Sequence, residues 1–131
     1  MGDQPRSGAV LYAKDVARIV HFYSTVLPLR VTDRKRDYVV LESPGFQLVV
    51  LKVPHDVASS ITLNVPPTRR ANVAVKLVFF VTSIASVRAS ADACGGTLNP
   101  RDSEWEFCGV RVCDGLDPEG NVIQFRELGK G

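Results

Sequence analysis

Residues 117–121 read Asp-Pro-Glu-Gly-Asn, and this pentapeptide is the stretch that decides the fold. An aspartate-proline pair followed by a glycine is typical of a tight turn, because proline fixes φ and glycine accepts a positive φ. β-rich runs lie on both sides of the turn, at residues 110–113 and 121–127, and a shorter run lies at 97–99. We therefore expect three strands in this part of the chain.

A strand and a helix are predicted ahead of these three strands. Residues 73–81 form a strongly apolar run, and Ser83 follows where the side chain of a helix N-cap would accept a hydrogen bond from a backbone amide. A weaker helical face comes next and ends before two glycines; it consists of Ile84, Val87, Ala91 and Cys94. The predicted order is strand, helix and three strands.

The N-terminal part of the chain shows the same order. A strand-like run at residues 8–14 leads to Asp15, a second candidate N-cap. The helical face that follows ends before Pro28 and consists of Val16, Ile19, Val20, Tyr23 and Leu27. Three β-rich runs come after it, at residues 29–32, 37–42 and 46–53.

This repeat predicts an α+β fold built from two βαβββ modules in tandem. The modules span residues 7–53 and 73–128, and a segment rich in proline, serine, threonine and asparagine connects them at 54–72. Asp15 and Ser83 are 68 residues apart, and a half of that length is too small to bury a substantial core alone. We expect the modules to pack as one domain over residues 1–131, with helices on the outer face and a concave mixed β-sheet cavity inside.

Composition and charge narrow the function. The 131 residues carry a net charge of +2, far from the clustered positive charge that nucleic-acid binding requires. The cysteines Cys94, Cys108 and Cys113 are odd in number and lack CxxC spacing, so they predict reduced thiols in a cytoplasmic protein. No apolar run reaches the roughly 18 to 20 residues needed to cross a membrane, so we expect no membrane span. With only His21 and His55, a site with several histidine ligands is excluded.

The sequence resembles the vicinal oxygen chelate superfamily, which includes glyoxalase I, extradiol ring-cleaving dioxygenases and bleomycin-resistance proteins. Two stretches carry the resemblance: residues 15–27, and residues 109–121 with the Asp-Pro-Glu-Gly-Asn turn. The resemblance covers nearly the whole chain and implies a single glyoxalase-like domain. It also implies that a metal-dependent member would take four ligands from the first and fourth strand of each half, commonly histidine and glutamate.

Carrying these ligand positions over to this chain places them at Gly8, Val50, Lys76 and Gln124. Glycine and valine offer no side-chain donor, an ammonium group repels a cation, and an amide oxygen is a weak ligand. Shifting each position by two residues along its strand yields no histidine or acid either. The sequence therefore predicts no metal site and no cofactor.

Strand alternation then predicts which side chains line the cavity. The expected ligand-binding residues are Tyr12, Val50, Lys52, Lys76, Phe80, Gln124 and Arg126, with Trp105 as a further stacking candidate. Apolar walls with a few convergent polar groups are typical of a small-molecule site, and the basic residues favour an anionic ligand. The alternative is that the long basic side chains extend to the rim and bind nothing, and that Trp105 belongs to the core or to a subunit interface.

Three hypotheses about function follow. The first is a metal-free small-molecule-binding protein of the glyoxalase/bleomycin-resistance type that sequesters an anionic or aromatic compound. The second is an enzyme: a lyase, isomerase or dioxygenase whose metal is held by atypical ligands, or a metal-free catalyst that uses Lys76 or Tyr12 as a general acid or base. The third is an assembly module. The resemblance implies a homodimer, and the sequence identifies no catalytic residue.

Overall fold

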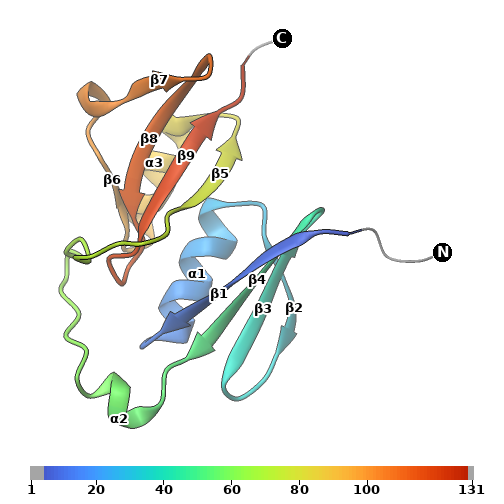
Figure 1. Cartoon of the computed structure of the whole chain (residues 1–131), viewed down its shortest axis with the longest axis vertical. Helices are drawn as coiled ribbons and strands as arrows, with labels where there is room; N and C mark the ends of the chain where they lie inside the picture. Colours follow the sequence, from blue (N-terminus) through green and yellow to red (C-terminus); the bar gives the residue numbers. More distant parts are fainter. Residues whose placement is uncertain (1–4, 130–131) are drawn as a thin grey trace. The chain divides into compact units, whose positions relative to one another are not determined.

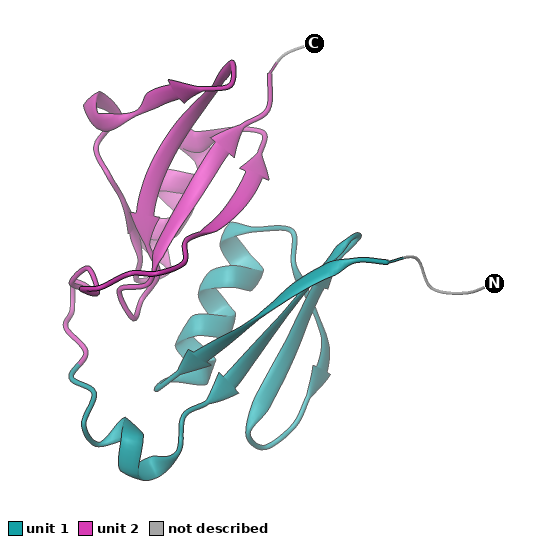
Figure 2. Ribbon diagram, viewed as in Figure 1, with its two compact units in different colours: residues 1–62 teal, residues 63–131 magenta. Residues whose placement is uncertain are grey.

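The computed structural model describes residues 5–129 and divides the chain into two compact units. Unit 1 comprises residues 1–62 and unit 2 comprises residues 63–131 (Figure 2). The division falls inside the segment that we expected to connect two modules. Among the described residues, no helix is long and apolar enough to cross a membrane.

Unit 1 is a four-stranded mixed sheet with one long helix on one of its faces (Figure 1). The strand order is β1-β4-β3-β2, with β1 parallel to β4 and the other neighbours antiparallel. Its elements are β1 (Ser7–Ala13), α1 (Val16–Val26), β2 (Arg30–Arg34), β3 (Tyr38–Ser43), β4 (Phe46–Lys52) and the short helix α2 (His55–Ala58).

Helix α1 forms where its sequence signals place it. The Asp15 carboxylate accepts a hydrogen bond from the backbone N–H of Arg18 at 3.1 Å, which satisfies one of the unpaired amides of the first turn. The predicted apolar face is buried, with Ile19, Val20 and Tyr23 against the sheet, and His21 is exposed on the other side. The helix and one face of the sheet thus form the core of unit 1.

Unit 2 repeats this plan with one additional strand. The order β5-β9-β8-β6 corresponds to that of unit 1, β5 is parallel to β9, and β7 pairs with β8 beside this path. Its elements are β5 (Leu77–Val81), α3 (Ile84–Ala93), β6 (Thr97–Leu98), the 3-10 turn at Arg101–Ser103, β7 (Trp105–Phe107), β8 (Val110–Leu116) and β9 (Val122–Glu127). The predicted α+β class with two repeated modules is confirmed.

The N-terminus of α3 is capped from two sides. The Ser83 hydroxyl accepts a hydrogen bond from the Ser86 N–H at 3.1 Å, as the sequence predicts. The Glu127 carboxylate accepts another from the Ile84 N–H at 2.9 Å. A carboxylate at this end of a helix also interacts favourably with the helix dipole. Glu127 therefore points to the helix side of its strand, away from Gln124.

The Asp-Pro-Glu-Gly-Asn turn proves to be structural. Buried Asp117 accepts hydrogen bonds from the backbone N–H groups of Glu119 (2.9 Å) and Asn121 (3.0 Å). Gly120 has φ of +81°, and a Cβ there would lie only 2.1 Å from the carbonyl oxygen of Thr68. Arg70 adds an ion pair to Glu119 at 3.6 Å. The turn therefore holds the segment around residues 68–70 onto unit 2.

The structure corrects the expected strand limits and the face of one strand. β5 begins at Leu77 rather than at residue 73, and β8 continues to Leu116 rather than ending at Cys113. Val50 was expected in the cavity, but it pairs with Leu11 and Val39 and is completely buried on the side of α1. Leu48, two residues earlier on the same face of β4, is also fully buried. The alternation of β4 is thus shifted by one residue.

Candidate functional site

The side chains most suited to ligand binding lie on the sheet face of unit 2 that is turned away from α3. We call this the helix-free face, and its side chains come from Val78, Phe80, Trp105, Phe107, Val112, Asp114, Gln124 and Arg126. Strand pairing sets one row across it: Trp105 lies opposite Val112, Val112 opposite Arg126, and Arg126 opposite Phe80. The neighbouring row pairs Asp114 with Gln124 and Gln124 with Val78.

Arg126 stands at the centre of this face between two aromatic rings. Its guanidinium carbon lies 4.9 Å from the ring centroid of Phe107 and 5.7 Å from that of Phe80. Both distances are within the range of a cation–π interaction. Its Nε donates a hydrogen bond to Oε1 of Gln124 at 2.8 Å. These contacts hold the guanidinium in one orientation.

A chain of polar contacts connects Arg126 to Lys76. The buried Gln124 donates from Nε2 to Oδ1 of Asp114 at 3.1 Å, and Nζ of Lys76 forms an ion pair with the other carboxylate oxygen at 2.9 Å. The Gln124 amide thus uses both its donor and its acceptor, which satisfies a buried polar group. Because Asp114 neutralises Lys76, Lys76 is a weaker anion-binding candidate than the sequence suggested.

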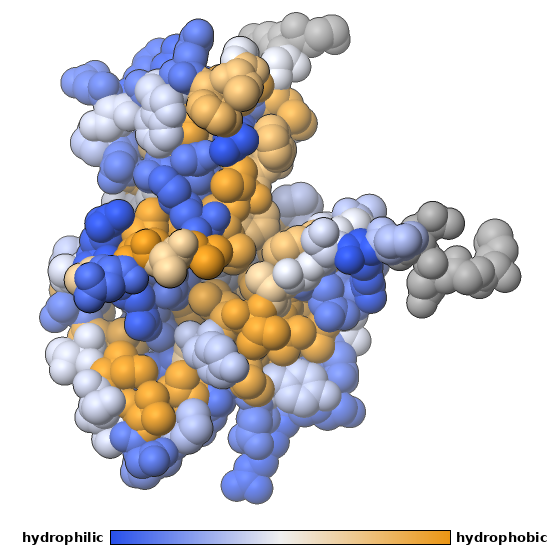
Figure 3. Space-filling view, in the orientation of Figure 1, coloured by the Kyte–Doolittle hydropathy of each residue, from blue (hydrophilic) through white to orange (hydrophobic). Residues whose placement is uncertain are grey.

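Exposed aromatic rings complete the helix-free face. The exposed fractions are 57% for Phe80, 40% for Trp105 and 48% for Phe107. Three large rings with this exposure on one sheet face, two of them beside a cation, are unusual for a surface that only covers a core. Figure 3 shows apolar and strongly polar surface next to each other on the part of the chain formed by unit 2. Such a surface can stack a flat molecule and pair with a negative charge on it.

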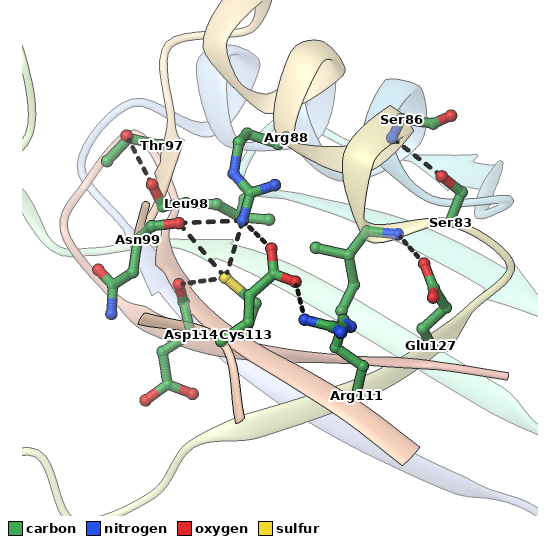
Figure 4. Close-up of polar contacts among 12 residues, drawn as sticks. Ser83, Ser86, Arg88, Thr97, Leu98, Asn99, Arg111, Cys113, Asp114 and Glu127 are labelled. Atoms are coloured by element: carbon green, nitrogen blue, oxygen red, sulfur yellow. Dashed lines mark hydrogen bonds and ion pairs between the residues drawn. The ribbon is translucent and has the colours of Figure 1, made fainter. Parts of the chain in front are cut away.

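The opposite side of the same sheet contains a charged cluster that holds β7 in place (Figure 4). The Glu104 carboxylate, whose side chain is only 4% exposed, accepts a hydrogen bond from Arg88 of α3 and another from Arg111 of β8 at 3.2 Å. Arg88 also donates to the backbone oxygen of Asn99 at 3.1 Å. Glu104 immediately precedes β7, so this cluster fixes the strand that carries Trp105 and Phe107.

Cys113 lies beside this cluster and is not an activated nucleophile. Its Sγ is 3.5 Å from Nη2 of Arg88, but the thiol is fully buried. Burial raises the pKa of Cys113 above its usual value, and the nearby Arg88 only partly opposes this effect. The hydrogen bond to Glu104 in turn raises the pKa of Arg88, so this side chain keeps its positive charge. The thiol therefore stays protonated and packs as a small apolar group.

Unit 1 holds the remaining predicted residues, and its helix-free face is different in character. Tyr12 lies on that face and is exposed, next to Leu51 on the neighbouring strand. Lys52 does not lie there. It pairs with Ala13 at the end of β4 and is two residues from buried Val50, so its side chain is on the helix side of the strand. The structure therefore brings together Lys76, Phe80, Trp105, Gln124 and Arg126, all within unit 2.

The side chains at the four superfamily ligand positions offer few donors for a metal ion. Gly8 has no donor, Val50 is buried on the helix side, Lys76 is bound to Asp114, and Gln124 is bound to Asp114 and Arg126. With the corrected register of β4, the residues that pair with β1 on the helix-free face are Gln47, Val49 and Leu51, which bring no imidazole or carboxylate. Within residues 5–129, no group of three or more His, Cys, Asp or Glu side chains could hold a metal ion.

Two members of the helix-free face were absent from the sequence prediction. Asp114 was missed because the predicted strand ended at Cys113, although Asp114 has the same parity as Val112 and would have faced Gln124 in a longer strand. Phe107 was missed because residues 105–107 were not assigned to a paired strand. Its spacing of two residues from Trp105 is the signal that would have placed both rings on one face.

The chain matches known proteins in both sequence and fold. A family model described as a glyoxalase-like domain matches residues 8–125, whereas no curated protein matches. A glyoxalase/bleomycin resistance protein/dioxygenase family enzyme from Burkholderia phytofirmans PsJN has a similar structure, with a TM-score of 0.70, 16% identity, and coverage of 93% of this chain and 97% of that one. A glyoxalase/bleomycin resistance protein from Albidiferax ferrireducens T118 is also similar, with a TM-score of 0.65 and 18% identity. The match covers 95% of this chain and 98% of that one.

A further structural match extends over all of this chain. The oxidase ChaP-H2 has a TM-score of 0.61 and 15% identity, with 98% of its own chain covered. At these identities the structural likenesses establish the fold, which is the tandem βαβββ fold of glyoxalase-like proteins. Because the family model spans most of the sequence, the chain belongs to the glyoxalase-like domain family of the vicinal oxygen chelate superfamily.

Proposed function

We propose that this protein is a metal-free small-molecule-binding protein of the glyoxalase/bleomycin-resistance type, and that it binds an anionic or aromatic compound on the helix-free face of unit 2. The observation that carries the proposal is Arg126, which is held by Gln124 and lies over the rings of Phe80 and Phe107. Among the described residues, no acidic side chain forms an ion pair with it.

The geometry supports binding because Arg126 is oriented before any ligand arrives. An immobilised guanidinium loses less conformational entropy on binding than a free surface arginine, so more of the interaction energy appears as affinity. Exposed rings beside it offer apolar area that a ligand can cover. The charge of Lys76 is already compensated by Asp114, so it contributes less than Arg126.

The donor chemistry supports the metal-free part of the proposal. The superfamily positions in this chain present a glycine, a valine, a lysine and a glutamine, of which only the glutamine has a neutral oxygen donor. Binding and sequestration need neither a metal nor a nucleophile. The helix-free face can perform them with the side chains that it has.

The first test combines metal analysis with ligand screening. We expect protein purified without chelators to contain far less than one equivalent of zinc, iron, nickel or manganese. We also expect anionic or aromatic compounds in a broad small-molecule library to raise the melting temperature, because a ligand that binds only the folded state stabilises it. Arg126→Gln should remove these shifts, whereas Arg36→Gln, the same change on the exposed β2–β3 loop, should retain them.

Stoichiometric metal would contradict the metal-free proposal and favour an enzyme with atypical ligands. A library in which no compound shifts the melting temperature would contradict small-molecule binding at this face. Shifts that persist in Arg126→Gln would place the binding site elsewhere on the chain.

A further inference from the structure

We infer that the ligand is a flat aromatic carboxylate, whose carboxylate pairs with Arg126 and whose ring lies against Trp105 and Phe107. This inference rests on the proposed function and specifies the ligand class for the same site. It joins two features that are separate in the general proposal, a charge and an aromatic plane. The register of the sheet places both in one row.

The charge requirement follows from how the cations near the sheet of unit 2 are paired. Lys76 binds Asp114, Arg70 binds Glu119, and Arg88 and Arg111 share Glu104. Arg69 and Arg101 also form no ion pair among the described residues, but both are exposed and lie outside the strands. Within the described residues, Arg126 has no acidic partner within 4.0 Å, although the two rings partly shield it from water. A desolvated cation is favoured by a negative charge, and a guanidinium matches the two oxygens of a carboxylate.

The remaining hydrogen-bonding capacity of Arg126 fits a carboxylate. Its Nε is used by Gln124, and no other hydrogen bond to the guanidinium is formed by the described residues. Its two NH2 groups therefore remain to bind a ligand, and together they can donate to both oxygens of one carboxylate. A neutral amide or a cation could not pair with them in this way.

The acidic groups near this face disfavour a cationic ligand. Asp114 is the one acid that the described strands place on the helix-free face, and it already binds Lys76 and Gln124. Glu106 pairs with Arg111 in the ladder, and so has the opposite parity to Trp105 and Phe107. An amine would therefore have to break the Asp114 contacts before it could be bound.

The aromatic requirement follows from the row that contains Arg126. Trp105 and Arg126 are separated by a single strand, which places their backbones about 10 Å apart. Val112 between them is completely buried, so the surface of this row is provided by its aromatic and guanidinium neighbours. A rigid ring attached to a carboxylate can lie along this row with little loss of internal freedom, because it has few rotatable bonds.

Three matched compounds test the inference on the full chain. We would measure binding of naphthalene-2-carboxylate, of its saturated analogue decahydronaphthalene-2-carboxylate, and of naphthalene-2-carboxamide by isothermal titration calorimetry. We expect the aromatic carboxylate to bind about 3- to 10-fold more tightly than the saturated acid, because the ring contacts are lost in the latter. We expect it to bind about 10- to 100-fold more tightly than the neutral amide, because a charge-assisted bidentate pair is lost.

Variants then connect each part of the ligand to a residue. Arg126→Gln should reduce the affinity for the aromatic carboxylate to that of the amide, and Arg126→Lys should restore only part of it, because lysine keeps the charge without the planar fork. Trp105→Leu should reduce the preference for the aromatic over the saturated acid, and the further change Phe107→Leu should remove it. Arg36→Gln is the matched charge control and should bind like the unchanged protein. Circular dichroism confirms that each variant is folded.

The single tryptophan provides an independent reading of the position of the ring. Naphthalene-2-carboxylate should shift the one indole N–H resonance in a 1H–15N spectrum through the ring current of the bound naphthalene. Equal affinity for the aromatic and saturated acids would overturn the aromatic requirement. Equal affinity for acid and amide would overturn the charge requirement. After either result, the proposed binding function would still hold if library compounds of another class bound in a way that depends on Arg126. If no library compound bound in that way, both the inferred ligand class and the proposed binding function would be contradicted.

Discussion

The two units share a strand order but present different helix-free faces. In unit 1 the central positions of that face are aliphatic: Val49 of β4 lies between Val10 of β1 and Val40 of β3. Tyr12 lies at one end of the face. In unit 2 the equivalent layer carries charge and aromatic rings around Arg126. Unit 1 also lacks, among its described residues, a strand that corresponds to β7.

This difference shows which features the repeated fold determines and which it leaves open. In both units one helix covers one sheet face and buries its apolar positions, so that face is constrained by packing. The other face is free of that constraint and can vary in chemistry. The added β7 contributes two of the three exposed rings on the face of unit 2, which makes it the part of the chain that most distinguishes the two units.

The largest expected effect tests which face of β4 is helix-free. Val50→Asp places a carboxylate on the helix side of unit 1, where we expect a loss of at least about 3 kcal/mol in the free energy of unfolding, because the buried charge has no partner. Val49→Asp changes the neighbouring residue on the helix-free face and should cost much less. Urea unfolding followed by circular dichroism measures both. Equal losses would mean that the two faces of β4 are not distinct in the way that the pairing indicates.

The next effect tests whether the Glu104 cluster gives unit 2 its distinctive face. Glu104→Gln leaves Arg88 and Arg111 without a carboxylate on the helix side of the sheet, and we expect a loss of about 1–3 kcal/mol, since Arg111 is half exposed and can be rehydrated. The emission of Trp105 should shift to longer wavelength as β7 loosens. Glu106→Gln, the same change at an exposed position on β7 itself, is the control.

Unchanged Trp105 emission in Glu104→Gln would show that β7 is held by its pairing with β8 alone. A shift in the Glu106→Gln control as large as that in Glu104→Gln would show that the emission reports general loosening rather than the loss of this cluster. Affinity for naphthalene-2-carboxylate adds a reading that stability does not give, because a positioning role predicts weaker binding even where the variant is fully folded.

The sequence predicted those features of the fold that depend on local chemistry. Asp15 and Ser83 both cap their helices as expected, because an N-cap is recognised from one side chain and the residues that follow it. The Asp-Pro-Glu-Gly-Asn turn likewise lies between the last two strands. Its contact with the segment around Thr68 could not be predicted, because the two partners are distant in sequence.

Strand alternation was the least predictable feature, and β4 shows why. Residues 48–51 of this strand are all apolar, so the sequence contains no polar residue to mark which face is turned away from the helix. In β9 the polar residues Gln124 and Arg126 mark the helix-free face, and their predicted placement agrees with the ladder. The burial of Glu104 could not be predicted, because its partners Arg88 and Arg111 are brought to it only by the fold.

The smallest expected effect concerns Glu42, an acid on the helix-free face of unit 1, for which we predict a titration midpoint below the usual range. Its carboxylate accepts hydrogen bonds from Thr32 (2.6 Å) and from Arg6, and these two contacts, the Thr32 bond first, lower its pKa. Thr32→Val should therefore raise the midpoint that NMR records at the Glu42 carboxyl carbon. Thr25→Val, an exposed change on α1, should not.

The sign of the pH effect on stability follows from the lowered pKa of Glu42. The folded chain releases this proton more readily than the unfolded chain, so the contribution of Glu42 is present above its unfolded pKa and is lost as the pH falls through its folded pKa. Between these two values the unfolding free energy should decrease less steeply with falling pH in Thr32→Val than in the unchanged protein. An identical slope would show that Thr32 does not stabilise the charged carboxylate, and that the Glu42 contact of unit 1 rests on Arg6 alone.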